Sequence, residues 1–385
     1  MDTRRSIGLV FSYNEDWIAG AYYILNIIHA LNRLEEIQKP SITVLTDSIS
    51  NFDFVYKETK YPYLDYHIYP FKPVKYNLVE KAINRISFFL IKKKLINKRK
   101  SIPKLDFVYP RSLYLISGDL KRINWVPDFQ EEYLPHLFSE EEVLKRKKFQ
   151  KEVVAEGDIV VLSSKDAKDD FVRLYPNSKA KPFVLNFAVT HPDFSEENIE
   201  ELKAKHGLKK NYFFAPNQFW AHKNHIIILK AVRYLKDKGV EVVVAMSGKA
   251  SDYRNKDNFK NLENYIKING LDNNIKLLGF LPRREQLCLF NNALAVIQPS
   301  LFEGWSTVVE DSKKLNKILI LSNLKVHKEQ VKENGFFFNP EDIIDLASNI
   351  EVVIKNEPKT KIINYDQNVL NFAKDFIRLI DFSLN

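Results

Sequence analysis

The sequence predicts an α/β protein made of two doubly wound, Rossmann-like domains that face each other across a central cleft. Two observations lead to this fold class. At 385 residues, the chain exceeds the usual size of one compact domain. Short apolar runs typical of strands alternate with amphipathic helical stretches, and this alternation stops near residue 190 and then begins again. The hydrophobic fraction of 45% is that of an ordinary globular protein, so disorder is excluded.

The first half of the chain opens with a βαβ pattern. Residues 7–12 (IGLVFS) predict a buried strand, residues 17–32 an amphipathic helix and residues 41–45 (SITVL) a second strand. Residues 54–69 are rich in aromatic side chains and fit no single element. Further strands are predicted at residues 106–109, 122–127 and 158–162, with helices at residues 140–155 and 166–174.

The predicted domain boundary lies near residue 190. Pro176, Pro182 and Pro192 interrupt the alternation there. We therefore expect an N-terminal domain at residues 1–190 that binds the acceptor, a C-terminal domain at residues 191–365 that binds a nucleotide, and a helix at residues 366–385 that packs back on the first domain. Strands of the second half are predicted at residues 212–215, 240–245, 275–278, 295–298, 317–321 and 335–338.

In such sheets, ligands bind beyond the carboxyl ends of the strands. Residues 302–311 follow the strand predicted at 295–298, so Glu303 lies in a loop of the expected cleft. Gly304 lets backbone approach a ligand closely, and Ser306 and Thr307 suit the start of a helix whose amide groups attract an anion. Glu310, on the first turns of that helix, is expected to face the same cleft. An alternative is that Glu310 only complements the helix dipole.

The segment PSLFEGWSTVVED, residues 299–311, resembles the donor-site signature of the retaining glycosyltransferase family 4, which has the GT-B fold. The usual signature has seven residues between its two glutamates, whereas six separate Glu303 from Glu310 here. This variant resembles a branch with EGWST found among cell-surface polysaccharide enzymes. The resemblance implies that Glu303 contacts hydroxyls of the donor sugar and Glu310 the ribose of the nucleotide.

A second match is FAPNQFWAHKNH, residues 214–225, where polar residues follow a strand. The resemblance implies that Asn217 and Gln218 approach the donor and that Lys223 binds its diphosphate. A fixed lysine also suits that role on physical grounds, because departure of a nucleoside diphosphate builds negative charge. A solvated loop lysine is the alternative. His222 and His225 lack a third ligand nearby, so they predict no metal site.

Three further positions complete the predicted donor site. Ser247 follows one strand, and Gly279 and Phe280 follow the next, where relatives hold the nucleobase against backbone. Ordinary glycine-containing turns are the alternative. In the first half, Gly20 lies in a helix that resembles the first helix of the family, and it either approaches the donor phosphates or packs the helix.

The segment WVPDFQ, residues 125–130, resembles part of the same branch and supplies the polar residues of the N-terminal side of the cleft. Asp128 is predicted to orient the acceptor hydroxyl, with capping of a turn as the alternative. Gln130 is the other polar residue expected in the cleft. Glu131 stands where relatives often have a histidine.

The resemblance implies transfer of a sugar from a GDP- or UDP-linked donor to a hydroxyl of a glycan or lipid-linked glycan, as in lipopolysaccharide or capsule synthesis. The anomeric configuration is retained and neither a metal nor a cofactor is needed. Alternatives are a nucleotide-sugar epimerase of the same fold, or a non-catalytic protein that binds glycans at a membrane surface.

The net charge of +9 is concentrated in residues 85–100, where seven basic residues and no acidic one are interleaved with apolar side chains. As a helix, Arg85–Lys100 either binds anionic lipid head groups or lies on the protein by its apolar face. No nucleic-acid motif accompanies the charge. The N-terminus lacks the apolar core of a signal peptide, no stretch is long enough to span a bilayer, and the single cysteine excludes an internal disulfide. We expect a cytoplasmic protein, or one on the inner face of the plasma membrane.

Overall fold

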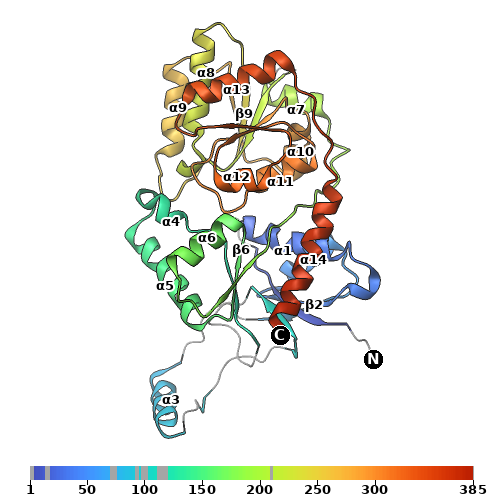
Figure 1. The fold of residues 1–385 in the computed structure, drawn as a ribbon, viewed down its shortest axis with the longest axis vertical. Helices are drawn as coiled ribbons and strands as arrows, with labels where there is room; N and C mark the ends of the chain where they lie inside the picture. Colours follow the sequence, from blue (N-terminus) through green and yellow to red (C-terminus); the bar gives the residue numbers. More distant parts are fainter. Residues whose placement is uncertain are drawn as a thin grey trace.

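The computed structural model describes residues 4–13, 18–69, 76–91, 95–96, 103–110, 120–208 and 211–384. Two α/β lobes follow one another along the longest axis of the molecule, with the N-terminal lobe below the C-terminal one in Figure 1. Every strand pair within the described sheets is parallel. The predicted fold class is therefore confirmed.

The N-terminal lobe contains two neighbouring groups of strands. The first has the order β3-β2-β1-β4 and the second the order β5-β6-β7. All four residues of β6 are buried, as expected for a strand that helices cover on both faces. The strands are β1 (Ser6–Val10), β2 (Ser41–Thr46), β3 (Leu64–Ile68), β4 (Phe107–Tyr109), β5 (Ile123–Val126), β6 (Ile159–Leu162) and β7 (Lys181–Val184).

Serine side chains start several helices of this lobe. Ser48, Ser139 and Ser164 each accept a hydrogen bond from a backbone amide in the first turn that follows. The helices are α1 (Ile18–Leu31), α2 (Ile49–Thr59), α3 (Leu78–Ile91), α4 (Gln130–Tyr133), α5 (Glu140–Glu156) and α6 (Lys165–Leu174).

The C-terminal lobe is one sheet with the strand order β10-β9-β8-β11-β12-β13. The order reverses between β8 (Phe213–Pro216) and β11 (Val296–Gln298), so the topological switch point lies there. The other strands are β9 (Val244–Ser247), β10 (Ile275–Gly279), β12 (Leu319–Ser322) and β13 (Gly335–Phe338).

Helices cover both faces of this second sheet. One apolar core joins the sheet to α8 (His225–Asp237), α9 (Asn258–Ile268) and α13 (Ile343–Asn356). The core on the other face includes α7 (Ile199–His206), α10 (Arg283–Asn291) and α11 (Thr307–Lys314). The short helix α12 (Lys325–Gln330) follows β12.

The last helix, α14 (Tyr365–Leu384), returns to the N-terminal lobe. It lies beside α1 in Figure 1, and its residues Phe372, Phe376 and Leu379 belong to the same apolar core as β1 and α1. The chain therefore crosses between the lobes twice, once before α7 and once before α14.

Some elements differ from the sequence expectations. Residues 54–69, left unassigned above, form the end of α2 and the edge strand β3, whose exposed positions obscure a strand pattern. The strand expected at residues 240–245 is β9 and begins only at Val244. The helices α7 and α12 were not predicted because both are short and mostly polar.

The basic segment Arg85–Lys100 begins inside α3. Residues 92–94 and 97–100 lie outside the described residues, and they carry six of its seven basic side chains. Within the described part of the chain, no helix is both long and apolar enough to cross a bilayer.

Candidate functional site

A buried ion pair lies at the switch point of the second sheet. Lys223 ends the 3-10 turn η4 (Ala221–Lys223) after β8, and Glu303 lies in the loop between β11 and α11. The Lys223 Nζ and Glu303 Oε1 atoms are 2.6 Å apart, and the two side chains are only 17% and 9% exposed. Two residues that sequence analysis assigned to one reaction are thus brought together from neighbouring strands.

Hydrogen bonds hold Glu303 in place. Its Oε1 also accepts from Gln298 Nε2 at 2.7 Å and from Ser300 Oγ at 2.7 Å. Asn217 Nδ2 donates to Gln298 Oε1 at 2.6 Å, which links a third predicted site residue to the pair. Burial alone would raise the pKa of Glu303, but the Lys223 ammonium outweighs this effect, and the pKa falls to about 2. Glu303 is therefore an anion at neutral pH.

Other strand ends of the sheet are close to this pair. A Cβ atom on Gly248 would lie 2.1 Å from the Asn217 carbonyl oxygen, so only glycine allows the two loops to meet. Ser247 is buried, and its Oγ has no partner among the described residues. Gly279, at φ 69°, accepts a hydrogen bond from the Gly248 amide, and the Phe280 ring is 59% exposed. Gln218 is half-buried.

Ser306 is the N-cap of α11, as its position predicts. Its Oγ accepts from the Val309 amide at 3.4 Å, and its own amide donates to Gln330 Oε1 at 3.0 Å. Thr307 is the first residue of the helix and is half-buried. The amino end of α11 is thus satisfied by side chains of this protein.

Glu310 does not face an open cleft. It is 1% exposed, and its Oε1 accepts from Lys313 Nζ at 2.8 Å and Gln330 Nε2 at 2.9 Å. Its Oε2 accepts from the hydroxyl of Tyr365, the first residue of α14, at 2.6 Å. Burial and the Glu310 charge raise the pKa of Tyr365 well above its usual value. We expected Glu310 to face the cleft; its carboxylate instead lies against Gln330 and Tyr365, which come from distant segments that local sequence does not reveal.

Asp311 contacts the segment before α7, where the chain first crosses between the lobes. Its carboxylate lies 2.5 Å from Arg283 Nη2 and 2.8 Å from Nε2 of His191, which precedes α7. Burial would raise the pKa of Asp311, but Arg283 and the hydrogen bond from His191 lower it to about 2. Sequence analysis did not identify this cluster, since its members are far apart along the chain.

The N-terminal lobe packs directly on the Glu303 loop. A Cβ atom on Gly304 would lie 2.5 Å from the Pro127 carbonyl oxygen and 2.9 Å from Asp128 Cβ. We expected Gly304 to admit a ligand, and the structure shows that it admits the opposite lobe. Asp128, whose side chain is 22% exposed, accepts a hydrogen bond from Arg146 Nη1 at 3.3 Å. It faces Gly304, which directly follows Glu303 in the chain.

Two neighbours of Asp128 are buried instead of lining a cleft. Gln130 is 5% exposed and accepts a hydrogen bond from Arg254 Nη1 at 3.3 Å. Glu131 is 2% exposed and pairs with Arg146 at 2.8 Å. Gly20 is buried in the first turn of α1, and residues 14–17 before it lie outside the described residues.

Buried histidines surround the pair without forming a metal site. His225 stacks on Phe219, and burial, followed by the charge of Lys223, lowers the pKa of His225 to about 3. His327 is fully buried and its Nδ1 lies 2.8 Å from the Ser322 carbonyl oxygen. In the part of the chain that the structure describes, no three His, Cys, Asp or Glu side chains are grouped so that they could hold a metal ion. Cys288 is buried, and burial raises the pKa of its thiol.

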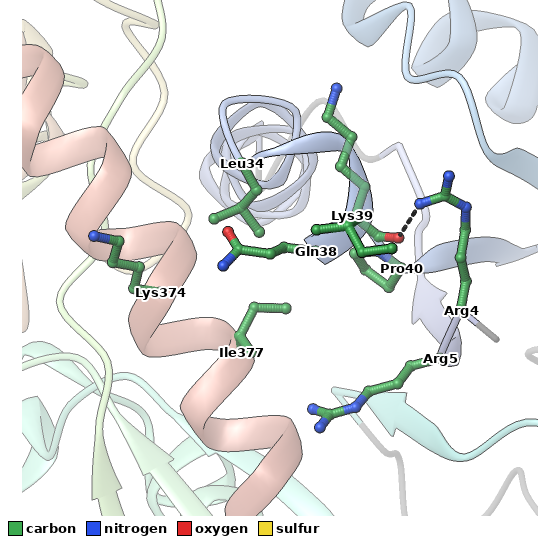
Figure 2. A pocket seen from close by; sticks show the side chains of 9 residues that line it. Arg4, Arg5, Leu34, Gln38, Lys39, Pro40, Lys374 and Ile377 are labelled. Atoms are coloured by element: carbon green, nitrogen blue, oxygen red, sulfur yellow. Dashed lines mark hydrogen bonds between the residues drawn. The ribbon is translucent and has the colours of Figure 1, made fainter.

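A cavity of about 310 Å³ lies away from this site (Figure 2). It is located where β1 and β2 begin, at the opposite edge of the first sheet from the strand ends that face the second lobe. Three of its four cations already have partners: Arg4 and Lys39 contact Glu36, and Arg5 contacts Asp381, whereas Lys374 has no ion pair among the described residues. Apart from Lys374, this cavity therefore has little charge left to attract a ligand.

Residues 198–368 match the family model described as glycosyl transferases group 1. The O-antigen chain mannosyltransferase RfbU of Salmonella typhimurium is 24% identical over 183 residues, which is 48% of this chain and 47% of RfbU. The chain thus spans about half the length of this curated relative.

The fold of the whole chain also matches solved structures. A crystal structure of HepE from Anabaena in complex with UDP and glucose has a TM-score of 0.67 at 12% identity, over 98% of this chain and 100% of HepE. A second HepE structure, in complex with UDP-glucose, has a TM-score of 0.61 at 14% identity, over 99% and 98%. Residues 198–368 are therefore similar to the glycosyl transferases group 1 family, and the chain as a whole has the GT-B fold.

Proposed function

We propose that this protein is a retaining glycosyltransferase. It moves a sugar from a nucleoside diphosphate donor to a hydroxyl of a glycan or lipid-linked glycan during surface polysaccharide synthesis. The observation that carries the proposal is the buried pair of Lys223 and Glu303 at the switch point of the second sheet. A solvated surface pair would not need the three further hydrogen bonds that order Glu303 and its neighbours.

Each member of the pair has a role in the proposed reaction. Lys223 stabilises the negative charge that develops on the departing diphosphate, and its low exposure strengthens that interaction. Glu303, an anion, accepts hydrogen bonds from hydroxyls of the transferred sugar. Asp128 lies across the contact between the lobes and orients the acceptor hydroxyl. Asn217, Gln218, Ser247, Gly279 and Phe280 line the remaining strand ends for the nucleotide.

The comparisons support a sugar donor and a polysaccharide acceptor. RfbU is a mannosyltransferase of O-antigen chains, and HepE was crystallised with UDP, with UDP and glucose, and with UDP-glucose. We therefore propose a UDP- or GDP-linked hexose as the donor. In this proposal Lys223 meets the diphosphate charge, and activity should survive treatment with EDTA.

The test is a binding and hydrolysis screen of UDP- and GDP-linked sugars. Wild type should bind and slowly hydrolyse one of them, whereas Glu303→Ala and Lys223→Ala should lower turnover about 100-fold or more. The matched control is Glu285→Ala, which removes a carboxylate that pairs with Lys205 on the surface of α10 and should leave turnover unchanged.

Three outcomes of the screen contradict the proposal. Wild type that binds no nucleotide sugar is not a glycosyltransferase of this type. Binding without transfer to any glycan extract indicates a non-catalytic protein, and interconversion of donor sugars indicates an epimerase.

We also propose that α3 attaches the protein to an anionic membrane surface. The helix stands apart from both lobes in Figure 1, and it exposes Phe89 by 79%, Leu90 by 70% and Ile86 by 60%. Its buried residues are instead the polar Asn84 and Ser87, which bond to the backbone of Ile96 and Leu95. Apolar side chains that point outward beside a basic segment are typical of a helix that lies in the lipid interface.

A further inference from the structure

A small cavity lies between the two lobes, next to the Lys223–Glu303 pair. Its volume is about 90 Å³. The N-terminal lobe contributes His136 from the 3-10 turn Pro135–Leu137, and the C-terminal lobe contributes His222 from η4. The loop after β9 supplies Asp252, Arg254 and Asn255. The predicted site included none of these residues.

His222 lines this cavity, and its imidazole ring makes no hydrogen bond to a described residue. The residue is 7% exposed. Burial, followed by the adjacent Lys223 charge, lowers the pKa of His222 to about 3. The ring is therefore neutral at physiological pH and offers one donor and one acceptor nitrogen. Its ring nitrogens are not among the fully buried polar atoms that lack a partner, so they are open to the cavity and can bond a group there.

Arg254 has unused donors in the same cavity. Its side chain is 9% exposed and its guanidinium lies 4.1 Å from the Phe138 ring of the other lobe. Nη1 donates to Gln130 Oε1 and Nε to the Tyr253 hydroxyl, at 3.3 Å and 3.1 Å. Among the described residues Nη2 makes no hydrogen bond, so two N–H groups remain for a ligand.

Asp252 places an acceptor beside these donors. The residue is 4% exposed, and its carboxylate accepts from the amides of Ala221 at 2.8 Å and Arg254 at 3.0 Å. Each carboxylate oxygen has a second lone pair for a ligand hydroxyl. The same two bonds fix the carboxylate, so the cavity keeps its shape without a ligand.

The lining favours hydroxyl groups over an anion. It mixes donors on Arg254 and His136 with acceptors on Asp252 and His222, and a hydroxyl group both donates and accepts. Arg254 is already paired with Glu142, whose Oε1 lies 3.5 Å from Nε, and Asp252 adds a further negative charge, so a phosphate would gain little net attraction. The volume corresponds to about three water molecules, at roughly 30 Å³ each. That space suits the hydroxyls along one edge of a sugar.

The cavity adjoins only part of the proposed nucleotide site, because it shares the loops after β8 and β9 with Asn217, Gln218 and Ser247. Phe280, Ser306 and Thr307 lie where α10 and α11 begin, on one face of the second sheet. The cavity is bounded by the loops that lead into α8 and α9, which cover the opposite face. Lys223 and Glu303 lie between, at the switch point. A group in the cavity is therefore on the other side of Lys223 and Glu303 from Phe280, where the nucleobase is proposed to lie.

We propose that this cavity is a carbohydrate subsite, in which His222, Arg254, Asp252 and His136 bind hydroxyl groups of the acceptor sugar. The inference rests on the proposed transferase function and deepens it, because it makes the acceptor a glycan whose terminal sugar is recognised by both lobes. Closure of the lobes completes the subsite, since His136 comes from one and the other three residues from its partner lobe.

Saturation-transfer NMR with methyl glycosides tests this subsite. The probes are the methyl α- and β-glycosides of glucose, galactose, mannose and N-acetylglucosamine, each with the nucleotide that wild type binds. At least one probe should bind wild type. His222→Gln and His136→Ala should each weaken that binding about fivefold, as expected for a lost hydrogen bond. His136 is exposed, so its removal is compatible with folding.

The control variant is His206→Ala on α7, which lies on the opposite face of the second sheet from α8 and α9. It should bind the glycosides as wild type does. The nucleotide affinity of His222→Gln and His136→Ala, measured by calorimetry, should change less than about twofold, because neither side chain is among the proposed nucleotide contacts.

Two results overturn the subsite. One is that no methyl glycoside binds wild type in the presence of its nucleotide. The other is that the His222 and His136 variants bind glycosides as tightly as wild type and His206→Ala. Both differ from failure of the proposed function, in which wild type binds no nucleotide sugar at all.

Discussion

Glu303 and Glu310 lie in one short segment, yet their surroundings differ. Glu303 forms an ion pair with Lys223 from the adjacent strand end. Glu310 accepts hydrogen bonds from Lys313, Gln330 and Tyr365. A buried carboxylate needs such partners, because an unpaired buried charge is costly. Only the Glu303 pair lies at the switch point, and this difference makes Glu303 the stronger candidate for contact with the donor sugar.

Gly304 gives a residue-scale prediction. Gly304→Ala places a Cβ atom within 2.5 Å of the Pro127 carbonyl oxygen, so the lobes must separate slightly. The rate of sugar transfer should fall about 10-fold or more, because small displacements of reacting groups lower the reaction rate strongly. Nucleotide affinity should change little, since the proposed nucleotide contacts belong to the C-terminal lobe alone. Steady-state kinetics and calorimetry provide the two measurements.

Equal losses of nucleotide binding and turnover in Gly304→Ala would contradict this explanation. They would mean that Gly304 is needed for the donor itself, as the sequence alone suggested. Circular dichroism should show an unchanged fold in either case.

At the scale of elements, α3 is unusual because its polar residues are buried and its apolar residues are exposed. In a helix packed on a protein core the reverse holds. The sequence left two interpretations of the basic segment, and the described part of α3 supports the lipid interface. Residues 92–94, which are all lysine, lie outside the described residues but contribute their charge.

Liposome sedimentation tests the role of α3. Binding to vesicles that contain anionic lipid should fall at least about fivefold for Ile86→Asp with Phe89→Asp, because burial of apolar side chains drives interfacial binding. The charge reversals Lys92→Glu, Lys93→Glu and Lys94→Glu should weaken binding further, with a stronger effect at low salt.

Ile362 supplies the matched control, because it is an isolated apolar side chain that is 89% exposed and lies outside α3. Ile362→Asp should bind vesicles like wild type. Equal loss in this control, or full binding by the α3 variants, would exclude α3 as the attachment site.

At the scale of the whole molecule, buried carboxylates link α11 to both segments that cross between the lobes. Asp311 joins Arg283 of the C-terminal lobe to His191 of the first crossing, and Glu310 joins α11 to Tyr365 of the second crossing. The helix α11, which begins after the Glu303 loop, therefore contacts both segments that connect the lobes. Domain closure and the position of α11 should be coupled for this reason.

Acid unfolding tests the Asp311 cluster. The folded-state pKa of Asp311 is about 2, below its ordinary value of 3.8, so the cluster stabilises the protein above pH 4. This stability, on the order of 2 kcal/mol, should be lost as pH falls from about 4 toward 2. Asp311→Asn should be less stable at pH 7 and should lose less stability over that interval.

Urea denaturation at pH 7 and at pH 3 measures this difference. The exposed Asp272→Asn is the control and should follow wild type at both values. A wild-type pH dependence that is unchanged in Asp311→Asn would show that other groups govern acid stability.

The sequence by itself determined the fold class and the central pair. Hydrophobic periodicity and chain length are local properties, so they predicted two parallel sheets and most element positions. The matching segments at residues 214–225 and 299–311 singled out Lys223 and Glu303 because both follow strand ends of one sheet.

Only the tertiary structure decided what the side chains contact. The burial of Glu310 against Tyr365, the packing of Pro127 on Gly304 and the cavity shared by His136 and His222 each join residues more than 50 positions apart. Local patterns carry no information about such pairs, because the partner is set by how the lobes close. The sequence therefore located the candidate site, while contacts between distant segments decided which side chains surround it.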